Sequence, residues 1–199
     1  ESVTEKRFEE HIEKELKSLN YSSRNYKDYD KELLLIKDEV IDFLKNTQPK
    51  KWNKLNDSYG IDTEKKVLQR ISSEISKRGI IDVLRNQVAD RGVYLDLCYF
   101  QPKSDLNPDL QKLYSFNQFT LVRQLHYSTE NENSIDIVLF LNGLPILTME
   151  LKNKATGQNY KHAEYQYKND RDPNEPFLRF KRCMVHFCVD KHNVSMTTR

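Results

Sequence analysis

The segment Ser134–Lys154, SIDIVLFLNGLPILTMELKNK, constrains the fold more than any other part of the chain. It contains two strand-like apolar runs joined at Asn142-Gly143, a dipeptide typical of β-hairpin turns. Three charged residues interrupt these runs, namely Asp136, Glu150 and Lys152. Burying an unpaired carboxylate is costly, so the pattern predicts a sheet whose charged positions lie beside cations or strong hydrogen-bond donors.

The faces that these charges occupy depend on the turn. Alternation along the second strand puts Thr148, Glu150 and Lys152 on one face and Leu147, Met149 and Leu151 on the other. A two-residue turn would place Asp136 opposite Met149 and leave Glu150 on the other face. A three-residue loop would place Asp136 opposite Thr148 or Glu150, with the two carboxylates within about 5–8 Å of each other. A shared site therefore predicts that the connection is not a simple two-residue turn, or that a bulge has the same effect.

Two carboxylates and a lysine on one sheet face suit a hard cation such as Mg²⁺, which takes one or two protein carboxylates and keeps several waters. In a phosphodiester reaction, Lys152 can orient the attacking water and stabilise the developing negative charge. The alternative is a structural Asp–Lys or Glu–Lys pair at a sheet edge. Zinc is not expected, because Cys183, His186 and Cys188 fit no zinc spacing and are interpreted as strand residues without chemistry.

The rest of the chain predicts a helical first half followed by strands. The expected helices are 4–19, 31–46, a short one from Pro49, one from Asp62 as N-cap to near Gly79, and 158–171. The expected strands are 93–100, 118–128, the two of the hairpin, and a pair within 183–198 joined across 190–193, with polar loops at 20–30 and through Pro102 and Pro108. The pattern predicts a mixed α/β fold, with a helical region over 1–91 packed on a core over 92–199 as one structural domain.

Composition supports a folded protein of ordinary type. Hydrophobic residues make up 37% and charged residues 31% of 199 residues, with a net charge of +2, so neither disorder nor a global basic signature is indicated. No run approaches the roughly 18 apolar residues that a membrane span needs. The three cysteines are an odd number and lie in apolar segments, which favours reduced thiols and an intracellular location.

The residues of the hairpin show a resemblance to a known family. IDIVLFLNGLPILTMELKN closely resembles the nuclease segment of the R (restriction) subunits of type I restriction-modification enzymes, which belong to the PD-(D/E)xK group. Asp136 matches the first acidic residue of that group, Glu150 the second and Lys152 the lysine, whereas Ile135 stands where the family usually has proline. Further similar segments include FEEHIEKEL, FLKNTQPKKWNKL, TGQNYKHAEYQYKNDRDP and FKRCMVHFCVD. The resemblance implies a restriction-endonuclease-like central mixed sheet flanked by helices.

The resemblance also implies roles for individual residues. Related nucleases carry a Gln-x-x-x-Tyr element after the lysine strand; Gln166 matches the glutamine, but Asp170 stands at the tyrosine position. A first-helix glutamate joins the metal site in some members, and Glu9 is the best match, with Glu10 as the alternative. The backbone carbonyl of Leu151 would complete the metal ligands. The basic residues suited to phosphate contacts are Lys154, Lys161, Lys168 and Arg171, together with Arg179, Lys181 and Arg182.

The function implied by the resemblance is Mg²⁺-dependent hydrolysis of double-stranded DNA in the prokaryotic cytoplasm. No G-x-x-x-x-G-K-[ST] motif occurs, so ATP binding and ATP-driven translocation would belong to other domains of the full-length subunit. Methylation and specificity subunits are the expected partners. Two alternatives remain open: a DNA-contacting docking module without cleavage activity, and another nuclease of the PD-(D/E)xK group. An ion bound between Asp136 and Glu150 would separate the first of these from an active nuclease.

Overall fold

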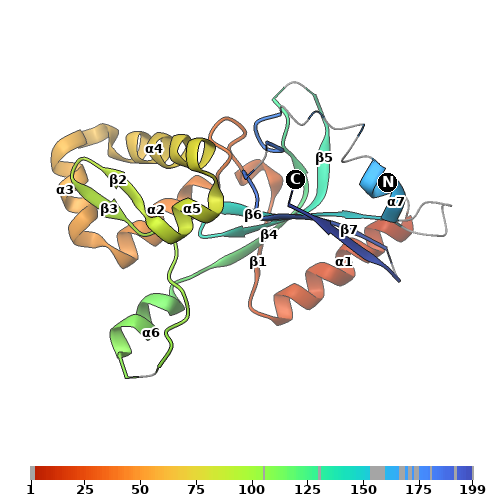
Figure 1. Cartoon of the computed structure of the whole chain (residues 1–199), viewed down its shortest axis with the longest axis horizontal. Coiled ribbons are helices and arrows are strands. Elements are labelled where there is room, and N and C mark those ends of the chain that lie inside the picture. Colours follow the sequence, from red (N-terminus) through yellow and green to blue (C-terminus); the bar gives the residue numbers. More distant parts are fainter. Residues whose placement is uncertain are drawn as a thin grey trace.

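The computed structural model describes residues 3–104, 106–129, 131–152, 160–165, 175–179, 181–190 and 192–198, together with Asn169 and Asp172. Its centre is a mixed sheet with the strand order β1-β4-β5-β6-β7-β8. The strands are β1 (Ser22–Arg24), β4 (Phe119–His126), β5 (Ser134–Leu141), β6 (Leu144–Leu151), β7 (Val185–Val189) and β8 (Val194–Thr197). The pairs β1–β4 and β6–β7 are parallel and the others antiparallel. The predicted α/β class, with a central mixed sheet flanked by helices, is confirmed (Figure 1).

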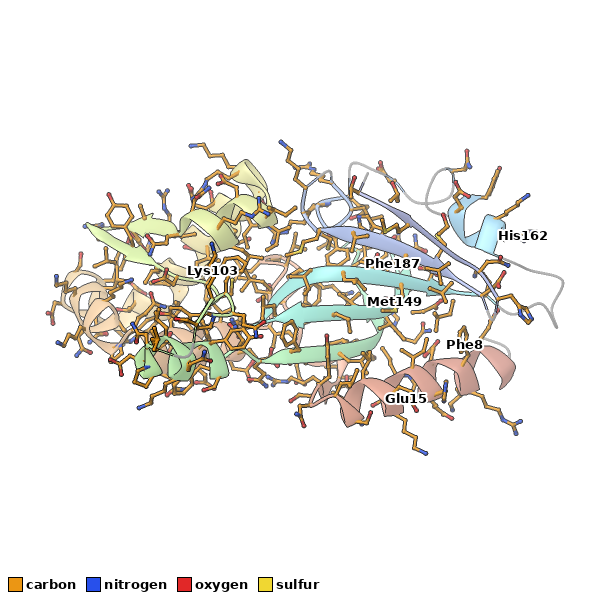
Figure 2. The ribbon with its side chains drawn as sticks, turned by 60° about the horizontal axis from the view of Figure 1, so that its bottom comes forward. Phe8, Glu15, Lys103, Met149, His162 and Phe187 are labelled. Atoms are coloured by element: carbon orange, nitrogen blue, oxygen red, sulfur yellow. The ribbon has the colours of Figure 1, made fainter. Side chains whose placement is uncertain are left out.

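One face of the sheet is covered by the first helix, α1 (Val3–Ser18). Phe8, Ile12 and Leu16 recur at helical spacing and pack against the sheet residues Leu147 and Met149. Figure 2 shows α1 running beneath the strands, with the short helix α7 (Tyr160–Tyr165) on the other side of the sheet. The predicted alternation of β6 therefore holds from Leu147 onward, because Leu147, Met149 and Leu151 share the cluster packed against α1.

A helical region lies beside the sheet (Figure 1). It contains α2 (Lys37–Thr47), α3 (Pro49–Tyr59), α4 (Thr63–Arg78), α5 (Ile80–Asn86) and a two-stranded hairpin of β2 (Val88–Asp90) and β3 (Val93–Leu95), with single 3-10 turns at Tyr26–Asp28 and Gly60–Asp62. Its core joins the sheet through Leu141 and Leu144, the residues that flank the β5–β6 turn. The helix α6 (Pro108–Ser115) extends away from this body, and none of its residues is buried.

The β5–β6 turn is buried where the sheet meets the helical region. Asn142 and Gly143 both have positive φ, 50° and 81°, and Leu141 pairs with Leu144, so the connection is a two-residue turn. The expectation of a three-residue loop is wrong, but its stated alternative, a bulge with the same effect, is confirmed. The register shifts between Leu139 and Phe140, and Ile146 is the extra residue on β6. This bulge restores the register that would place Asp136 opposite Glu150.

Several predicted elements differ in the structure. Residues 31–36 are not helical: the carboxylate of Asp30 accepts hydrogen bonds from the backbone N–H groups of Glu32 and Leu33, and Leu34 has a φ of 60°. The strand expected over 93–100 is only β3, which lies outside the central sheet. Asp62 precedes α4, but its side chain makes no capping hydrogen bond.

Several elements were not predicted, among them the strand β2 of the two-stranded hairpin. The chain expected to be a loop at 20–30 supplies β1, which pairs with β4. The polar loop through Pro108 contains α6, whose N-cap residue Asn107 accepts hydrogen bonds from the N–H groups of Asp109 and Leu110. The helix α5 follows α4 directly after Gly79. Within the described residues, no helix is both long enough and apolar enough to cross a membrane.

Candidate functional site

The candidate site lies where β5 and β6 separate. Among the described residues, the ladder between these strands ends at the pair Ile137–Met149. Continuing the same register would place Asp136 opposite Glu150, one position beyond the last pair. β5 remains paired with β4 over this stretch, through Leu125–Ile135. β6 likewise continues to pair with β7. The two carboxylates therefore lie at an opening between β5 and β6, and each of these strands is held in place by its other neighbour.

The carboxylate of Asp136 closes this opening with its own hydrogen bonds. Its Oδ2 accepts from the backbone N–H of Leu151 at 2.7 Å, and its Oδ1 accepts from Nε2 of Gln124 at 3.1 Å. The first bond crosses from β5 to β6 where the ladder has stopped. Each oxygen retains a second lone pair. Asp136 is half-buried, so a cation from solvent can reach it.

Glu9 approaches the same place from α1. It is 1% exposed, and its Oε1 accepts from Nε2 of Gln124 at 2.7 Å. Its Oε2 accepts from Nε of Arg123 at 3.0 Å. A single amide nitrogen thus links the carboxylates of Glu9 and Asp136. The neighbouring Glu10 is exposed, so Glu9 is the helix glutamate that lies at the site.

Glu150 and Lys152 lie on the face of β6 that is turned away from α1. Both are buried, at 2% and 9% exposure. The backbone N–H of Lys152 donates to the carbonyl of Val189 at 2.8 Å, which extends the β6–β7 ladder past the end of β6. On the same face, Thr148 Oγ1 and His186 Nδ1 are 2.7 Å apart. His186 is thereby paired within the sheet, in agreement with its interpretation as a strand residue.

The charges beneath the site balance one another. Arg123 bridges Glu9 and Glu13, with its Nη1 3.1 Å from Glu13 Oε2. Burial alone would lower the pKa of Arg123, but its hydrogen bonds to the two glutamates leave that pKa raised. For Glu13, burial raises the pKa, and hydrogen bonds from Lys17, Ser23 and Arg123 outweigh it and lower the pKa to about 2. Arg123 therefore stays cationic and Glu13 anionic.

The donor set is compatible with Mg²⁺ but does not form a complete protein cage. Among the described residues, no three His, Cys, Asp or Glu side chains gather closely enough to hold a metal ion. Mg²⁺ uses one or two carboxylates and retains several waters, so a pair such as Asp136 and Glu150 satisfies its requirement. The carboxylates at this place offer oxygen donors to a cation. Cys188, which pairs with Glu150 in the β6–β7 ladder, is a buried free thiol, as are Cys98 and Cys183.

The remaining predicted residues are distributed differently. Gln166, Lys154, Lys168 and Arg171 lie outside the described residues. Lys161 is exposed on α7, and Arg179 and Lys181 are also exposed. Arg182 is not available for phosphate: it is buried, and its guanidinium donates to the carbonyls of Leu33 and Ser72 and to Ser76 Oγ.

Sequence reasoning missed Arg123 and Gln124. Both lie in the stretch expected to be a strand, where polar residues at alternate positions normally indicate a solvent face. Gln124 has a φ of 49°, a left-handed conformation that no sequence pattern in a strand predicts. The available signal was the consecutive Arg-Gln pair inside an apolar strand, which breaks its alternation.

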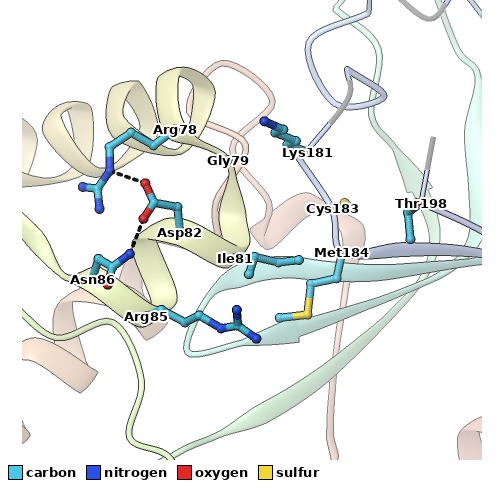
Figure 3. Close-up of a pocket in the computed structure, with 10 residues that line it drawn as sticks. All are labelled: Arg78, Gly79, Ile81, Asp82, Arg85, Asn86, Lys181, Cys183, Met184 and Thr198. Carbon is cyan, nitrogen blue, oxygen red and sulfur yellow. Dashed lines mark hydrogen bonds and ion pairs between the residues drawn. The ribbon is translucent and has the colours of Figure 1, made fainter.

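A separate cavity of about 510 Å³ lies between α5 and the segment around Lys181 (Figure 3). Its lining residues include Ile81, Met184 and Arg85. Arg78, at its edge, is bound to Asp82 and Glu74. No carboxylate of the β5–β6 opening reaches this cavity, so the two places are distinct.

The chain was also compared with known proteins. No curated protein matches it. The family described as "Type I restriction enzyme R protein N terminus" matches over residues 2–199, which includes α1, the helical region and every strand of the central sheet. That range also contains all the residues gathered at the opening between β5 and β6. The chain therefore belongs to the family of type I restriction enzyme R protein N-termini.

Proposed function

We propose that this chain is a metal-dependent endonuclease domain that hydrolyses phosphodiester bonds of double-stranded DNA. The observation that carries the proposal is the register of β5 and β6, which directs Asp136 and Glu150 to one opening, with Lys152 two residues farther along the same strand. Membership of this restriction-enzyme family supports the proposal, because a metal ion held by carboxylates can promote phosphodiester hydrolysis.

In the proposed mechanism, Asp136 and Glu150 would hold Mg²⁺, and the backbone carbonyl of Leu151 and the Glu9 carboxylate of α1 would be the further ligands. The bound ion would polarise the scissile phosphate and acidify a water molecule. The hydrogen bond from the Leu151 N–H fixes the direction of the Asp136 carboxylate. Lys152 would bring its ammonium group to the attacked phosphate and stabilise the negative charge that develops. Burial of Glu150 and Lys152 excludes competing water.

The DNA would cross the half-buried side of this opening. Lys161 on α7 is exposed, and its ammonium group would contact a phosphate. Gln166, Lys154, Lys168 and Arg171 are proposed to extend that contact. Contacts of this kind are independent of sequence, which fits an enzyme that cuts away from its recognition site.

The wider context follows from the family. Methylation and specificity subunits would supply target recognition, and an ATP-dependent translocase in the same subunit would bring distant DNA to this site in the prokaryotic cytoplasm. A docking module that contacts DNA without cutting it is the second candidate. It is favoured by the hydrogen bonds that already occupy Glu9 and Asp136.

The test uses variants in the assembled complex. Asp136→Asn, Glu150→Gln and Lys152→Ala are each expected to slow DNA cleavage by at least about 100-fold, because each removes a charged group that would act at the reacting phosphate. ATP hydrolysis and translocation should be unchanged. Glu10→Gln, on the exposed side of α1, is the matched control and should cleave normally. Normal cleavage by any of the three variants would show that its assigned role is wrong.

A further inference from the structure

The amide of Gln124 occupies an unusual place between two carboxylates. Its Nε2 lies 2.7 Å from Glu9 Oε1 and 3.1 Å from Asp136 Oδ1. Its Oε1 accepts from the hydroxyl of Ser134 at 2.9 Å. Because ionised carboxylates only accept hydrogen bonds, the nitrogen must be the end that faces them. The two N–H groups of one amide are thus divided between α1 and β5.

The backbone at Gln124 is strained in a way that orients this side chain. Its φ of 49° costs a non-glycine residue about 1–2 kcal/mol. The pairs on either side, Arg123–Ile137 and Leu125–Ile135, keep the same register, so Gln124 lies opposite Asp136 without inserting a residue. Strain of this kind persists where the surroundings hold it, and it is concentrated at functional sites.

We propose that Gln124 is a positioning residue of the metal site, whose amide holds the Glu9 carboxylate of α1 against the Asp136 carboxylate of β5. This inference rests on the proposed function. Without a cation, the amide supplies the donors that two neighbouring carboxylates need, while Arg123 occupies the other oxygen of Glu9. With a cation, the same hydrogen bonds keep one lone pair of each carboxylate directed at the ion.

Two substitutions separate the side chain from the strained backbone. Gln124→Asn retains an amide on a residue type that tolerates positive φ, but it is too short by one methylene group to reach both carboxylates. A purely conformational role predicts unchanged Ca²⁺ binding for this variant. A positioning role predicts Ca²⁺ affinity lower by about 10-fold or more, measured by calorimetry on the 199-residue chain.

Gln124→Glu tests the same contact by replacing the amide, which donates to both carboxylates, with a third carboxylate. In chelator, the variant brings three carboxylates together, and its Tm should fall by at least about 4 °C. Adding Glu9→Gln should restore most of that loss, and Ca²⁺ should raise the Tm of the single variant more than that of the wild type. Gln69→Glu, at an exposed position of α4, is the matched control and should leave the Tm and the Ca²⁺ affinity unchanged.

The outcomes distinguish this inference from the proposed function. Wild-type Ca²⁺ affinity in Gln124→Asn, with binding intact in the parent chain, would overturn the positioning role and leave the nuclease proposal standing. Absence of Ca²⁺ binding in the parent chain would overturn both. An unchanged Tm for Gln124→Glu in chelator would also contradict the positioning role.

Discussion

The guanidinium of Arg182 is buried in the helical region, where its acceptors among the described residues are the carbonyls of Leu33 and Ser72 and the hydroxyl of Ser76. Burial lowers the pKa of Arg182, and the nearby Tyr29 and Cys183 partly offset that effect. This arginine fastens the segment before β7 to α4. A charged side chain with neutral acceptors contributes chiefly through its hydrogen bonds and packing.

We expect Arg182→Ala to lower the free energy of unfolding by about 3 kcal/mol, because it removes three hydrogen bonds and leaves a cavity. Arg182→Met should recover part of that loss by filling the volume. Chemical denaturation measures both. The exposed Arg179→Ala serves as control and should stay within about 0.5 kcal/mol of the wild type. A stable Arg182→Ala variant with weakened DNA binding would contradict the structural role and support a phosphate contact.

Two glutamates with opposite pKa shifts connect helices to the sheet. Glu39 at the start of α2 accepts from Thr120 Oγ1 on β4 at 2.9 Å, and its other carboxylate oxygen is buried without a hydrogen-bond partner among the described residues. Burial raises the pKa of Glu39 despite its hydrogen bonds from Thr120 and Arg24. Glu13 on α1 has its pKa lowered to about 2.

The pKa shifts of Glu39 and Glu13 predict that their contributions to folding stability depend on pH in opposite directions. The raised pKa of Glu39 means that folding favours its protonated form, so stability is lost as the pH rises through that pKa. Glu39→Gln should therefore be more stable than the wild type at pH 7. This difference in the free energy of unfolding should narrow as the pH falls towards 4.5, the ordinary pKa of a glutamate. Glu13→Gln should be less stable at pH 7, with the difference narrowing between pH 4.5 and about 2. Urea titrations over this range provide the test, and parallel curves for the two variants would contradict it.

At the scale of elements, the β5–β6 hairpin is held at its turn by the helical region. Asn142 donates to the carbonyl of Leu97 at 3.0 Å and accepts from the N–H of Gln118 at 2.8 Å. The carbonyl of Gly143 accepts from the N–H of Ile36 at 2.9 Å, just before α2. A Cβ at Gly143 would lie 2.5 Å from the Ile36 carbonyl oxygen. The turn is therefore a docking point as well as a reversal of the chain.

Gly143→Ala should accordingly lower the free energy of unfolding by about 3 kcal/mol, combining left-handed backbone strain with a clash against main-chain atoms. Gly92→Ala is a close control, because its φ of 79° matches the 81° of Gly143 while nothing lies within 4 Å of its added Cβ. Only the strain of about 1 kcal/mol is expected there. Equal losses in the two variants, measured by denaturation, would show that the close approach to α2 is unimportant.

The elements that the sequence predicted are those in which one period dominates. The alternation of Leu147, Met149 and Leu151 in β6 and the helical spacing of Phe8, Ile12 and Leu16 in α1 each lead to a shared packed face, so the pattern and the structure agree. The helix prediction was wrong over residues 31–36, because a turn that buries Leu34, Leu35 and Ile36 is as apolar in sequence as a helix. The helix α6 was missed although Asn107-Pro108 is a helix-start signal, since the loop around it is polar.

The site was predictable only in part. Spacing and resemblance indicated Asp136, Glu150 and Lys152, and the structure directs the first two to one opening. A two-residue turn alone would place the two carboxylates on opposite faces of the sheet, and the bulge at Ile146 returns them to one face. Bulges depend on packing on both sides of a strand and have no sequence signature of their own here. For the same reason, the left-handed backbone of Gln124 could not be foreseen.

At the scale of the whole molecule, the two ends of the hairpin have different surroundings. The turn is buried against the core of the helical region, whereas the far end opens between β5 and β6 with α1 lying across the sheet face (Figure 1). Because the turn end of the hairpin is anchored, its far end can hold charged groups where the β5–β6 pairing stops, without a change in the register of the two strands. A cation bound there would link β5, β6 and α1, and so would stabilise the folded chain as well as serve the chemistry.

We propose that Asp136 and Glu150 share a divalent cation, and crystals of the 199-residue chain soaked in Mn²⁺ would reveal that ion through anomalous scattering. We expect a peak bounded by the two carboxylates at about 2.1 Å from their oxygens, lost in Asp136→Asn crystals soaked in the same way. Ordered carboxylates without such a peak at high Mn²⁺, or a peak only elsewhere in the molecule, would contradict it.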